Sequence, residues 1–209
     1  MVHVRKVNGE EEIFGNQGAL FMNAMTWFDH TTGSVWSQVW GRSIDGPLKG
    51  TELELLPSQT IPWGSWKAEH PETLLMINGS GKLRFTGERF FPGYVIGVAL
   101  DDDAKAYPYE AAAQVRVIND SLGEIPLVVV VNPETQAVSV FVRNVDGRDL
   151  TLRWADGLLE DEETGSQWDP TRGVSFTGPL QGKSLRPIPY TPAFPDSWRD
   201  FYPQSEFFE

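Results

Sequence analysis

The residues with the clearest chemical potential in this sequence are Asp29 and its neighbour His30. A carboxylate beside an imidazole can serve general acid–base catalysis, so the pair is our candidate catalytic site, and a hydrolase is the alternative function. The same aspartate directly precedes a Thr-Gly-Ser turn, where a carboxylate can accept backbone N–H groups and fix the turn. We favour this structural role for Asp29 over the catalytic one.

Other kinds of reactive site have little support in the sequence. The three histidines are far apart and show no His-x-x-x-His or Glu-x-x-His spacing, and the chain has no cysteine, so we expect no metal and no cofactor. The acidic runs at residues 101–103 and 160–163 lack the alternation of an EF-hand loop. They are better interpreted as solvated turns than as calcium sites.

An internal repeat shows which elements must position these residues. A shift of 132 residues aligns residues 33–76 with the C-terminal part of the chain at 14 of 44 positions, where composition alone predicts about three. Further upstream the shift becomes 138, so the first copy carries six extra residues between Gly9 and Asp29. This insertion is either a functional or a packing elaboration.

The repeat divides the chain into unequal parts. Residues 1–76 form a first, incomplete repeat, residues 77–92 a linker, and residues 93–209 a second, complete repeat. Whether the parts form one compact fold stays open. Because the first copy has no counterpart of the front strands of the second, it must share the middle segment, borrow strands from another chain or be covered differently, and the second of these options predicts a homo-oligomer.

Local patterns predict a mainly β (α+β) fold of antiparallel meander sheets with a few short helices and an internal pseudo-repeat. Turn residues over 119–123 predict a turn. Alanine content and the position of prolines predict helices over 63–70, 109–115 and 196–202. The predicted strands are residues 93–100, 105–108, 126–131, 137–143 and 149–154.

The repeat also separates the eight tryptophans into two groups. Trp36 aligns with Trp168 and Trp66 with Trp198, so both pairs are predicted core positions. The other tryptophans could stack on a sugar or an aromatic ligand, although ordinary packing is the simpler interpretation. These candidate ligand-binding residues are Trp27, Trp40, Trp63 and Trp154.

Composition excludes some partners. With 29 acidic and 17 basic residues and a formal charge of −12, the chain should repel phosphate backbones, so we expect no nucleic-acid binding. Apolar runs of about six residues are too short to span a membrane, and the first ten residues do not form a signal peptide. We therefore expect a soluble protein without membrane insertion, whose compartment is unknown.

Several phrases of the sequence resemble the domain-of-unknown-function family 3179, an uncharacterised prokaryotic family, and the resemblance covers nearly the whole chain. The family has no settled activity, so the resemblance implies little about function. The matching phrases are residues 29–38, 46–50, 53–57, 63–66 and 70–73 of the first copy, and 106–108, 117–120, 145–147 and 164–168 of the second.

The chain departs from that family at two motifs. Members often carry a Cys-Pro-Leu-Cys turn, whose cysteines align with Asn132 and Thr135, and a His-Glu pair, which aligns with Val115 and Arg116. Any thiol or metal chemistry that these groups support in the family cannot run here. The sequence therefore favours a soluble β-rich module that binds a ligand, such as a small molecule or carbohydrate, or a protein partner.

Overall fold

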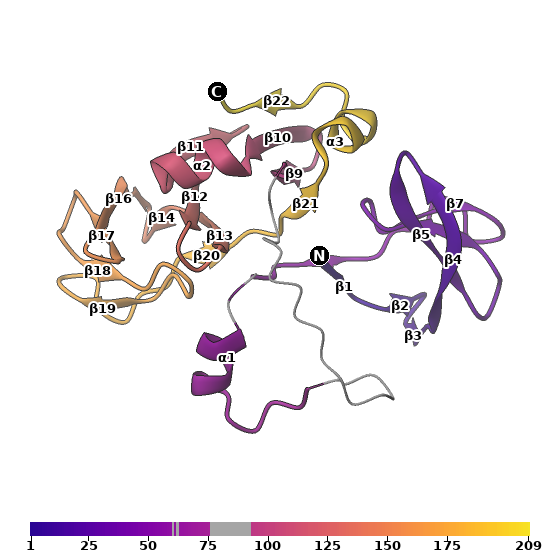
Figure 1. Cartoon of the computed structure of the whole chain (residues 1–209), viewed down its shortest axis with the longest axis horizontal. Helices are drawn as coiled ribbons and strands as arrows, with labels where there is room; N and C mark the ends of the chain where they lie inside the picture. Colours follow the sequence, from indigo (N-terminus) through magenta and orange to yellow (C-terminus); the bar gives the residue numbers. More distant parts are fainter. Residues whose placement is uncertain (60, 62, 76–92) are drawn as a thin grey trace.

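The computed structural model describes residues 1–59, 61, 63–75 and 93–209, in which the chain forms short strands and three short helices (Figure 1). The first repeat and the far end of the second repeat form β-rich lobes at opposite ends of an elongated molecule. The predicted linker over 77–92 falls outside the described residues. No helix within the described ranges is long and apolar enough to cross a membrane.

Two four-stranded sheets form the centre of the second repeat. One is an antiparallel meander extended by a later strand, which confirms the predicted sheet type. In the other, the last strand of the chain pairs parallel to its neighbour. In spatial order, the first sheet contains β11 (Val117–Leu122), β12 (Ile125–Asn132), β13 (Ala137–Val142) and β20 (Arg186–Pro187), and the second β21 (Thr191–Ala193), β9 (Val95–Leu100), β10 (Asp103–Pro108) and β22 (Glu206–Phe207).

Strand β12 is buried on both faces, as its nearly unbroken run of β-branched residues predicts. Leu127, Val129 and Val131 point into a core shared with β9 and β10. Val128 and Val130 point into a second core, which they share with the repeated lobe. The alternation of side chains along one strand therefore joins two layers of packing.

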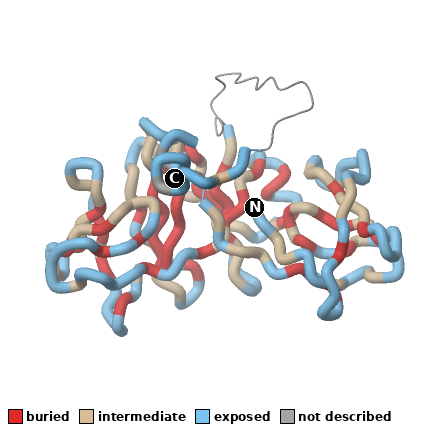
Figure 2. Tube along the Cα trace, turned by 90° about the horizontal axis from the view of Figure 1, so that it is seen from below, coloured by how far each residue is buried: buried red, intermediate tan, exposed pale blue. Residues whose placement is uncertain are grey.

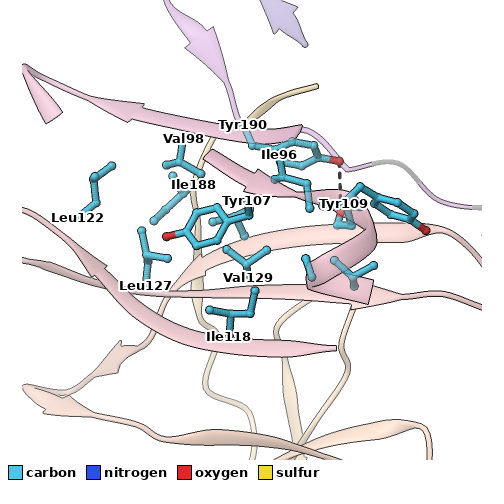
Figure 3. Close-up of a cluster of buried hydrophobic side chains, with 14 of the residues drawn as sticks. Ile96, Val98, Tyr107, Tyr109, Ile118, Leu122, Leu127, Val129, Ile188 and Tyr190 are labelled. Atoms are coloured by element: carbon cyan, nitrogen blue, oxygen red, sulfur yellow. Dashed lines mark hydrogen bonds between the residues drawn. The ribbon is translucent and has the colours of Figure 1, made fainter. Parts of the chain in front are cut away.

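The larger core lies between the two central sheets (Figure 3). Ile96 and Val98 from β9 and Tyr107 from β10 are fully buried and meet Ile118 from β11. Ile188 closes the cluster from the segment after β20. This packing holds β10 and β11 side by side and so positions their charged residues, Lys105 and Asp120, next to each other.

The predicted turn over residues 119–123 is wrong, because these residues belong largely to β11. The Asn119 side chain donates to the Leu152 carbonyl at 2.7 Å and accepts from the Leu152 N–H at 2.9 Å. Asp120 likewise gains partners on β10. Tertiary contacts thus satisfy polar side chains that would otherwise favour a local turn.

Both repeats contain an equivalent hairpin followed by a four-stranded sheet, in agreement with the alignment. The first repeat contains β2 (Lys6–Val7), β3 (Glu10–Glu11), β4 (Phe14–Phe21), β5 (Ala24–Asp29), β6 (Val35–Ser37) and β7 (Arg42–Asp45). The second contains β14 (Asn144–Val145), β15 (Arg148–Asp149), β16 (Leu152–Ala155), β17 (Leu158–Asp161), β18 (Gln167–Trp168) and β19 (Ser175–Thr177).

A close backbone approach explains the repeated Gly-Pro-Leu-x-Gly phrase. Gly46 has φ +92° and Gly178 has φ +83°, a backbone conformation that residues with a side chain rarely adopt. A Cβ atom would lie 2.8 Å from the Ser34 Cα at the first position and 2.7 Å from the Ser166 Cα at the second. Only glycine fits both copies.

The described part of the first repeat contains only the end of the central meander. Strand β1 (Val2–His3) pairs with β8 (Leu55–Leu56) as β13 pairs with β20, so His3 opposite Leu55 corresponds to Phe141 opposite Pro187. In the described part of the first repeat, nothing corresponds to β11 and β12. Figure 2 shows the buried segments concentrated in the second repeat and in the middle of the molecule.

The helices show the same asymmetry. Helix α2 (Tyr109–Val115) packs beside β12 and α3 (Pro195–Phe201) on β9, whereas α1 (Trp63–Glu69) lies apart from the sheets in Figure 1. Trp198 of α3 is fully buried against Gly97, but Trp66 of α1 is 39% exposed. The prediction that Trp66 is a core residue is wrong, because the sheet that covers Trp198 has no described counterpart in the first repeat.

Candidate functional site

An aromatic cluster joins the two repeats. Phe21 lies at the tip of the β4–β5 hairpin, which the six-residue insertion lengthens relative to β16–β17. Its ring centroid lies 5.9 Å from that of Trp40 and 6.0 Å from that of Phe201 on α3, and Trp40 and Phe201 meet edge to face at 4.9 Å. In this structure the insertion therefore packs the first repeat against the second.

A cleft of about 390 Å³ opens beside this cluster, and residues from both repeats line it. Such concave sites between structural units are common places for small ligands. Its polar and aromatic lining includes Trp40, Arg42 and Glu52 from the first repeat, and Asp101, Asp102, Tyr202 and Gln204 from the second.

An ion pair forms the first-repeat wall of the cleft. Arg42 Nη2 lies 2.5 Å from Glu52 Oε1, and the Arg42 guanidinium lies over the Trp40 ring at 5.5 Å. Arg42 and Glu52 also form an isolated backbone bridge, which matches the bridge between Val174 and Ser184 in the second repeat. The two repeats therefore share this backbone contact, but only the first carries a charged pair on it.

Tyr202 contributes an aromatic wall from the second repeat. Its ring lies 4.3 Å from that of Trp198. Burial raises the pKa of Tyr202, while the charges of Arg42 and Glu52 act in opposite directions. The phenol is thus neutral at pH 7 and presents both an apolar ring and a hydroxyl group.

A second cavity of about 300 Å³ adjoins the cleft, and Asp102 and Gln204 line both. It is more acidic than the cleft. Its charged lining comprises Asp102, Asp103, Lys105, Asp120 and Glu206.

A charged network forms the wall of the second cavity. Lys105 Nζ lies 2.8 Å from Asp120 Oδ2 and 3.5 Å from Glu206 Oε2, and the buried Tyr107 hydroxyl donates to Asp120 at 2.9 Å. Burial would lower the pKa of Lys105, but Asp120 and Glu206 raise it above its ordinary value. Burial would raise the pKa of Asp120, but hydrogen bonds from Lys105, Ser121 and Tyr107 keep it low.

These contacts assign a structural role to Tyr107. Burial and then the neighbouring Asp120 raise its pKa, so the hydroxyl remains protonated and serves as a hydrogen-bond donor. Together with Lys105 it ties β10 to β11 and β22.

The structure does not bring the four candidate tryptophans together. Trp40 lines the cleft, Trp27 is half-buried in the small core of the first repeat, and Trp63 is 40% exposed on α1. Trp154 is half-buried in the second repeat, under the guanidinium of Arg116 at 5.4 Å. Of the four, Trp40 alone is placed where a ligand between the repeats would meet it.

The two residues of the candidate catalytic pair, Asp29 and His30, have different surroundings. Asp29 is fully buried, accepts from the Thr32 N–H at 2.6 Å and from Trp36 Nε1 at 2.9 Å, and so fixes the turn. Burial would raise the pKa of Asp29, but hydrogen bonds from Trp36 and Thr32 keep it below its ordinary value. His30 is exposed and stacks on Phe28 at 5.1 Å.

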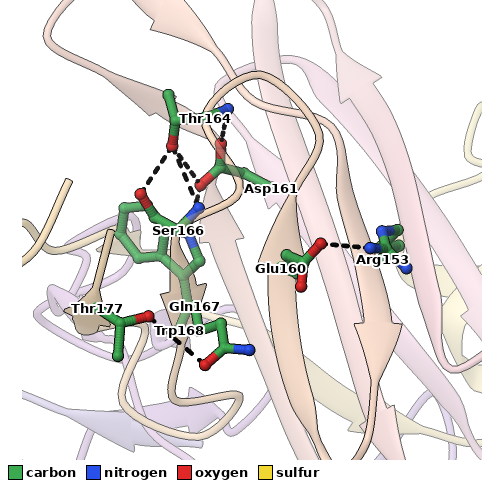
Figure 4. A network of polar contacts seen from close by, with 8 residues as sticks. All are labelled: Arg153, Glu160, Asp161, Thr164, Ser166, Gln167, Trp168 and Thr177. Atoms are coloured by element: carbon green, nitrogen blue, oxygen red, sulfur yellow. Dashed lines mark hydrogen bonds and ion pairs between the residues drawn. The ribbon is translucent and has the colours of Figure 1, made fainter. Parts of the chain in front are cut away.

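The second repeat builds the same turn without a histidine (Figure 4). Asp161 accepts from the Thr164 N–H at 2.6 Å and from Trp168 Nε1 at 2.9 Å. Ser166 Oγ lies 2.7 Å from Thr164 Oγ1 and accepts from the Leu180 N–H at 3.0 Å. Since both copies use the aspartate in this way, the geometry supports the structural interpretation of Asp29.

The sequence motifs do not reveal most of the cleft. The acidic run at residues 101–103 is typical of a solvated turn, and no motif marks Arg42, Glu52 or Tyr202. A signal was available in the alignment, because Trp40, Arg42 and Glu52, the polar and aromatic cleft residues of the first repeat, lie at positions where the two copies differ. No group of three or more histidine, cysteine or acidic residues in the described ranges is arranged to hold a metal ion.

The comparisons with known proteins agree with the repeat. The model of a protein family of unknown function, DUF3179, matches residues 1–94 and again residues 92–209. The chain belongs to the DUF3179 family. Comparison with curated proteins and with solved structures found no match.

The two departures from the DUF3179 motifs meet at one place in the fold. Val115 and Arg116 end α2, while Asn132 and Thr135 bound the turn between β12 and β13. Arg116 Nη2, at the end of α2, lies 2.5 Å from Glu134 Oε1 in the β12–β13 turn. Arg116 also has the unusual backbone angle φ +69°. An ion pair thus connects the end of α2 to the β12–β13 turn, the two places where this chain departs from the motifs that the resemblance implies.

Proposed function

We propose that this DUF3179 chain is a non-catalytic binding module that holds a small polar ligand in the cleft between its two repeats. The observation that carries this proposal is the cleft itself, with Trp40, Arg42 and Glu52 on one wall and Asp101, Asp102 and Tyr202 on the other. Neither repeat alone supplies both walls. Aromatic faces and charged groups together suit ligands with an apolar body and polar substituents, such as a small metabolite or a carbohydrate.

The difference between the copies supports the same conclusion. If the bridge at Arg42 and Glu52 served only the fold, the apolar and small pair Val174 and Ser184 would be sufficient, as it is in the second repeat. The charged pair occurs in the copy that faces the cleft. No contact that Asp29 or His30 makes with another described residue favours the alternative hydrolase.

A pair of blocking variants tests the proposal. Gln204 is exposed at the junction of the two cavities, so Gln204→Trp should fill the cleft without disturbing a core. Gln114 is exposed in another cavity, of about 580 Å³ beside α2, so Gln114→Trp is a matched control. A panel of sugars, amines, amino acids and aromatic acids would be screened by thermal shift, and hits measured by titration calorimetry on the full chain.

We expect Gln204→Trp to abolish binding of the hits and Gln114→Trp to leave it unchanged. The opposite pattern would move the ligand site to the cavity beside α2 and overturn the proposal. The homo-oligomer stays a separate prediction, which light scattering on the same samples checks.

A further inference from the structure

We infer that the ligand of the cleft is a linear aliphatic polyamine, which extends from the cleft into the adjoining cavity. This inference rests on the proposed function and specifies its ligand class. It combines three features: a pair of adjoining cavities that share lining residues, an excess of carboxylates that no described cation pairs with, and aromatic surface at one end.

The adjoining cavities suit an elongated occupant. The cleft of about 390 Å³ and its neighbour of about 300 Å³ share Asp102 and Gln204. A compact molecule would fill one of them only. A flexible chain can pass the shared residues and contact both.

The charges call for more than one positive group. Among the lining residues, Arg42 is paired with Glu52, and Lys105 is paired with Asp120 and Glu206. The remaining carboxylates belong to Asp101, Asp102 and Asp103, and no ion pair to them is present among the described residues. They line the cleft, the junction and the second cavity respectively. Amines spaced along a chain would match this distribution, whereas neutral sugars would leave these charges unbalanced.

The aromatic residues suit the methylene groups and one terminal ammonium. Trp40 and Tyr202 line the cleft end, and rings attract cations over their faces as well as covering apolar segments. Because the Arg42 guanidinium already lies over the Trp40 ring, Trp40 is left to cover methylene groups and Tyr202 to meet the terminal ammonium. None of the described residues that line the second cavity is aromatic, so the ligand is held there by charge.

Matched charge variants provide the test. Asp101 and Asp156 are both exposed turn residues with φ +52°, a conformation that asparagine tolerates, so Asp101→Asn and Asp156→Asn make the same chemical change inside and outside the cleft. Spermidine, putrescine, butylamine and neutral maltotriose would each be titrated calorimetrically into the full chain at low salt.

We expect saturable 1:1 binding in the order spermidine, putrescine, butylamine. Removing one exposed charge should weaken spermidine binding on the order of threefold in Asp101→Asn, with no change in Asp156→Asn. Equal weakening by both variants would show non-specific attraction to an acidic protein and overturn the inference. If maltotriose or another neutral hit binds in the cleft and spermidine does not, the ligand class is wrong while the binding function stands. If no ligand of the wider panel is sensitive to Gln204→Trp, the binding function fails as well.

Discussion

Replacing Asp161 by asparagine should destabilise the protein strongly, although the change removes only one charge and no volume. The carboxylate is fully buried beside the equally buried Trp168. Oδ1 accepts from the Thr164 N–H at 2.6 Å, and Oδ2 accepts from Trp168 Nε1 at 2.9 Å. An asparagine can reproduce the first bond, but its NH₂ group then faces the indole N–H, so donor meets donor.

The magnitude follows from the lost bond and the group left behind. A hydrogen bond to a charged group contributes about 1.5–3 kcal/mol, and an unsatisfied buried N–H costs about 1–3 kcal/mol. These terms overlap, so we expect Asp161→Asn to lower the free energy of unfolding by about 2–4 kcal/mol. Asp156→Asn, at an exposed turn, should change it by less than about 0.5 kcal/mol.

Urea unfolding followed by tryptophan fluorescence would measure both variants at pH 7. A loss below about 1 kcal/mol in Asp161→Asn would refute the reasoning, because the indole N–H would then have found another acceptor. The equivalent Asp29→Asn also separates the two interpretations of the first repeat. A structural Asp29 predicts a comparable loss, whereas a catalytic residue held only for activity predicts little loss or a gain of stability.

The pH dependence gives an independent check on Asp29. Its pKa is lowered from 3.8 in the folded state, so its hydrogen bonds contribute stability above that pH. This contribution is lost as the pH falls below 3.8 and through the folded-state pKa, and Asp29→Asn should remove that part of the acid dependence.

Two further substitutions test the comparison between repeats. The buried Nδ1 of His3 has no partner among the described residues, and burial lowers the pKa of His3. The stability of the protein should therefore fall as the pH drops below 6.5. His3→Phe, which copies Phe141 of the second repeat, should flatten this dependence in thermal melts from pH 8 to pH 5. A Cβ on Gly97 would lie 2.2 Å from the Trp198 ring, so Gly97→Ala should cost about 1–3 kcal/mol in urea unfolding, whereas Gly64→Ala on the open helix α1 should be neutral or stabilising. An unchanged pH profile or a stable Gly97→Ala protein would contradict the assigned packing.

The alignment predicted the parts of the fold that depend on local chemistry. Asp29 and Asp161 precede the same turn, and the structure gives both the same partners because those partners lie within seven residues of each. The helix over 109–115 was predicted correctly for the same reason.

Features that depend on distant segments were not predictable in this way. Trp66 and Trp198 occupy equivalent helices, but their burial depends on a sheet that only the second repeat presents among the described residues. Asp120 and Lys105 lie on different strands, and their spacing in the sequence does not predict the ion pair between them. The sequence pattern can locate an element, but it does not show what will cover it.

The same distinction explains why the candidate site lies where the copies differ. A repeat preserves residues that maintain its own fold, such as Trp36 and Trp168, which are buried identically. The contact between repeats is not part of either unit, so its residues are free to diverge. Trp40 and Arg42 align with Arg172 and Val174, and both first-copy residues face α3 or the cleft. Positions that break an internal repeat are therefore the ones to examine for binding in this chain, ahead of the residues that both copies retain.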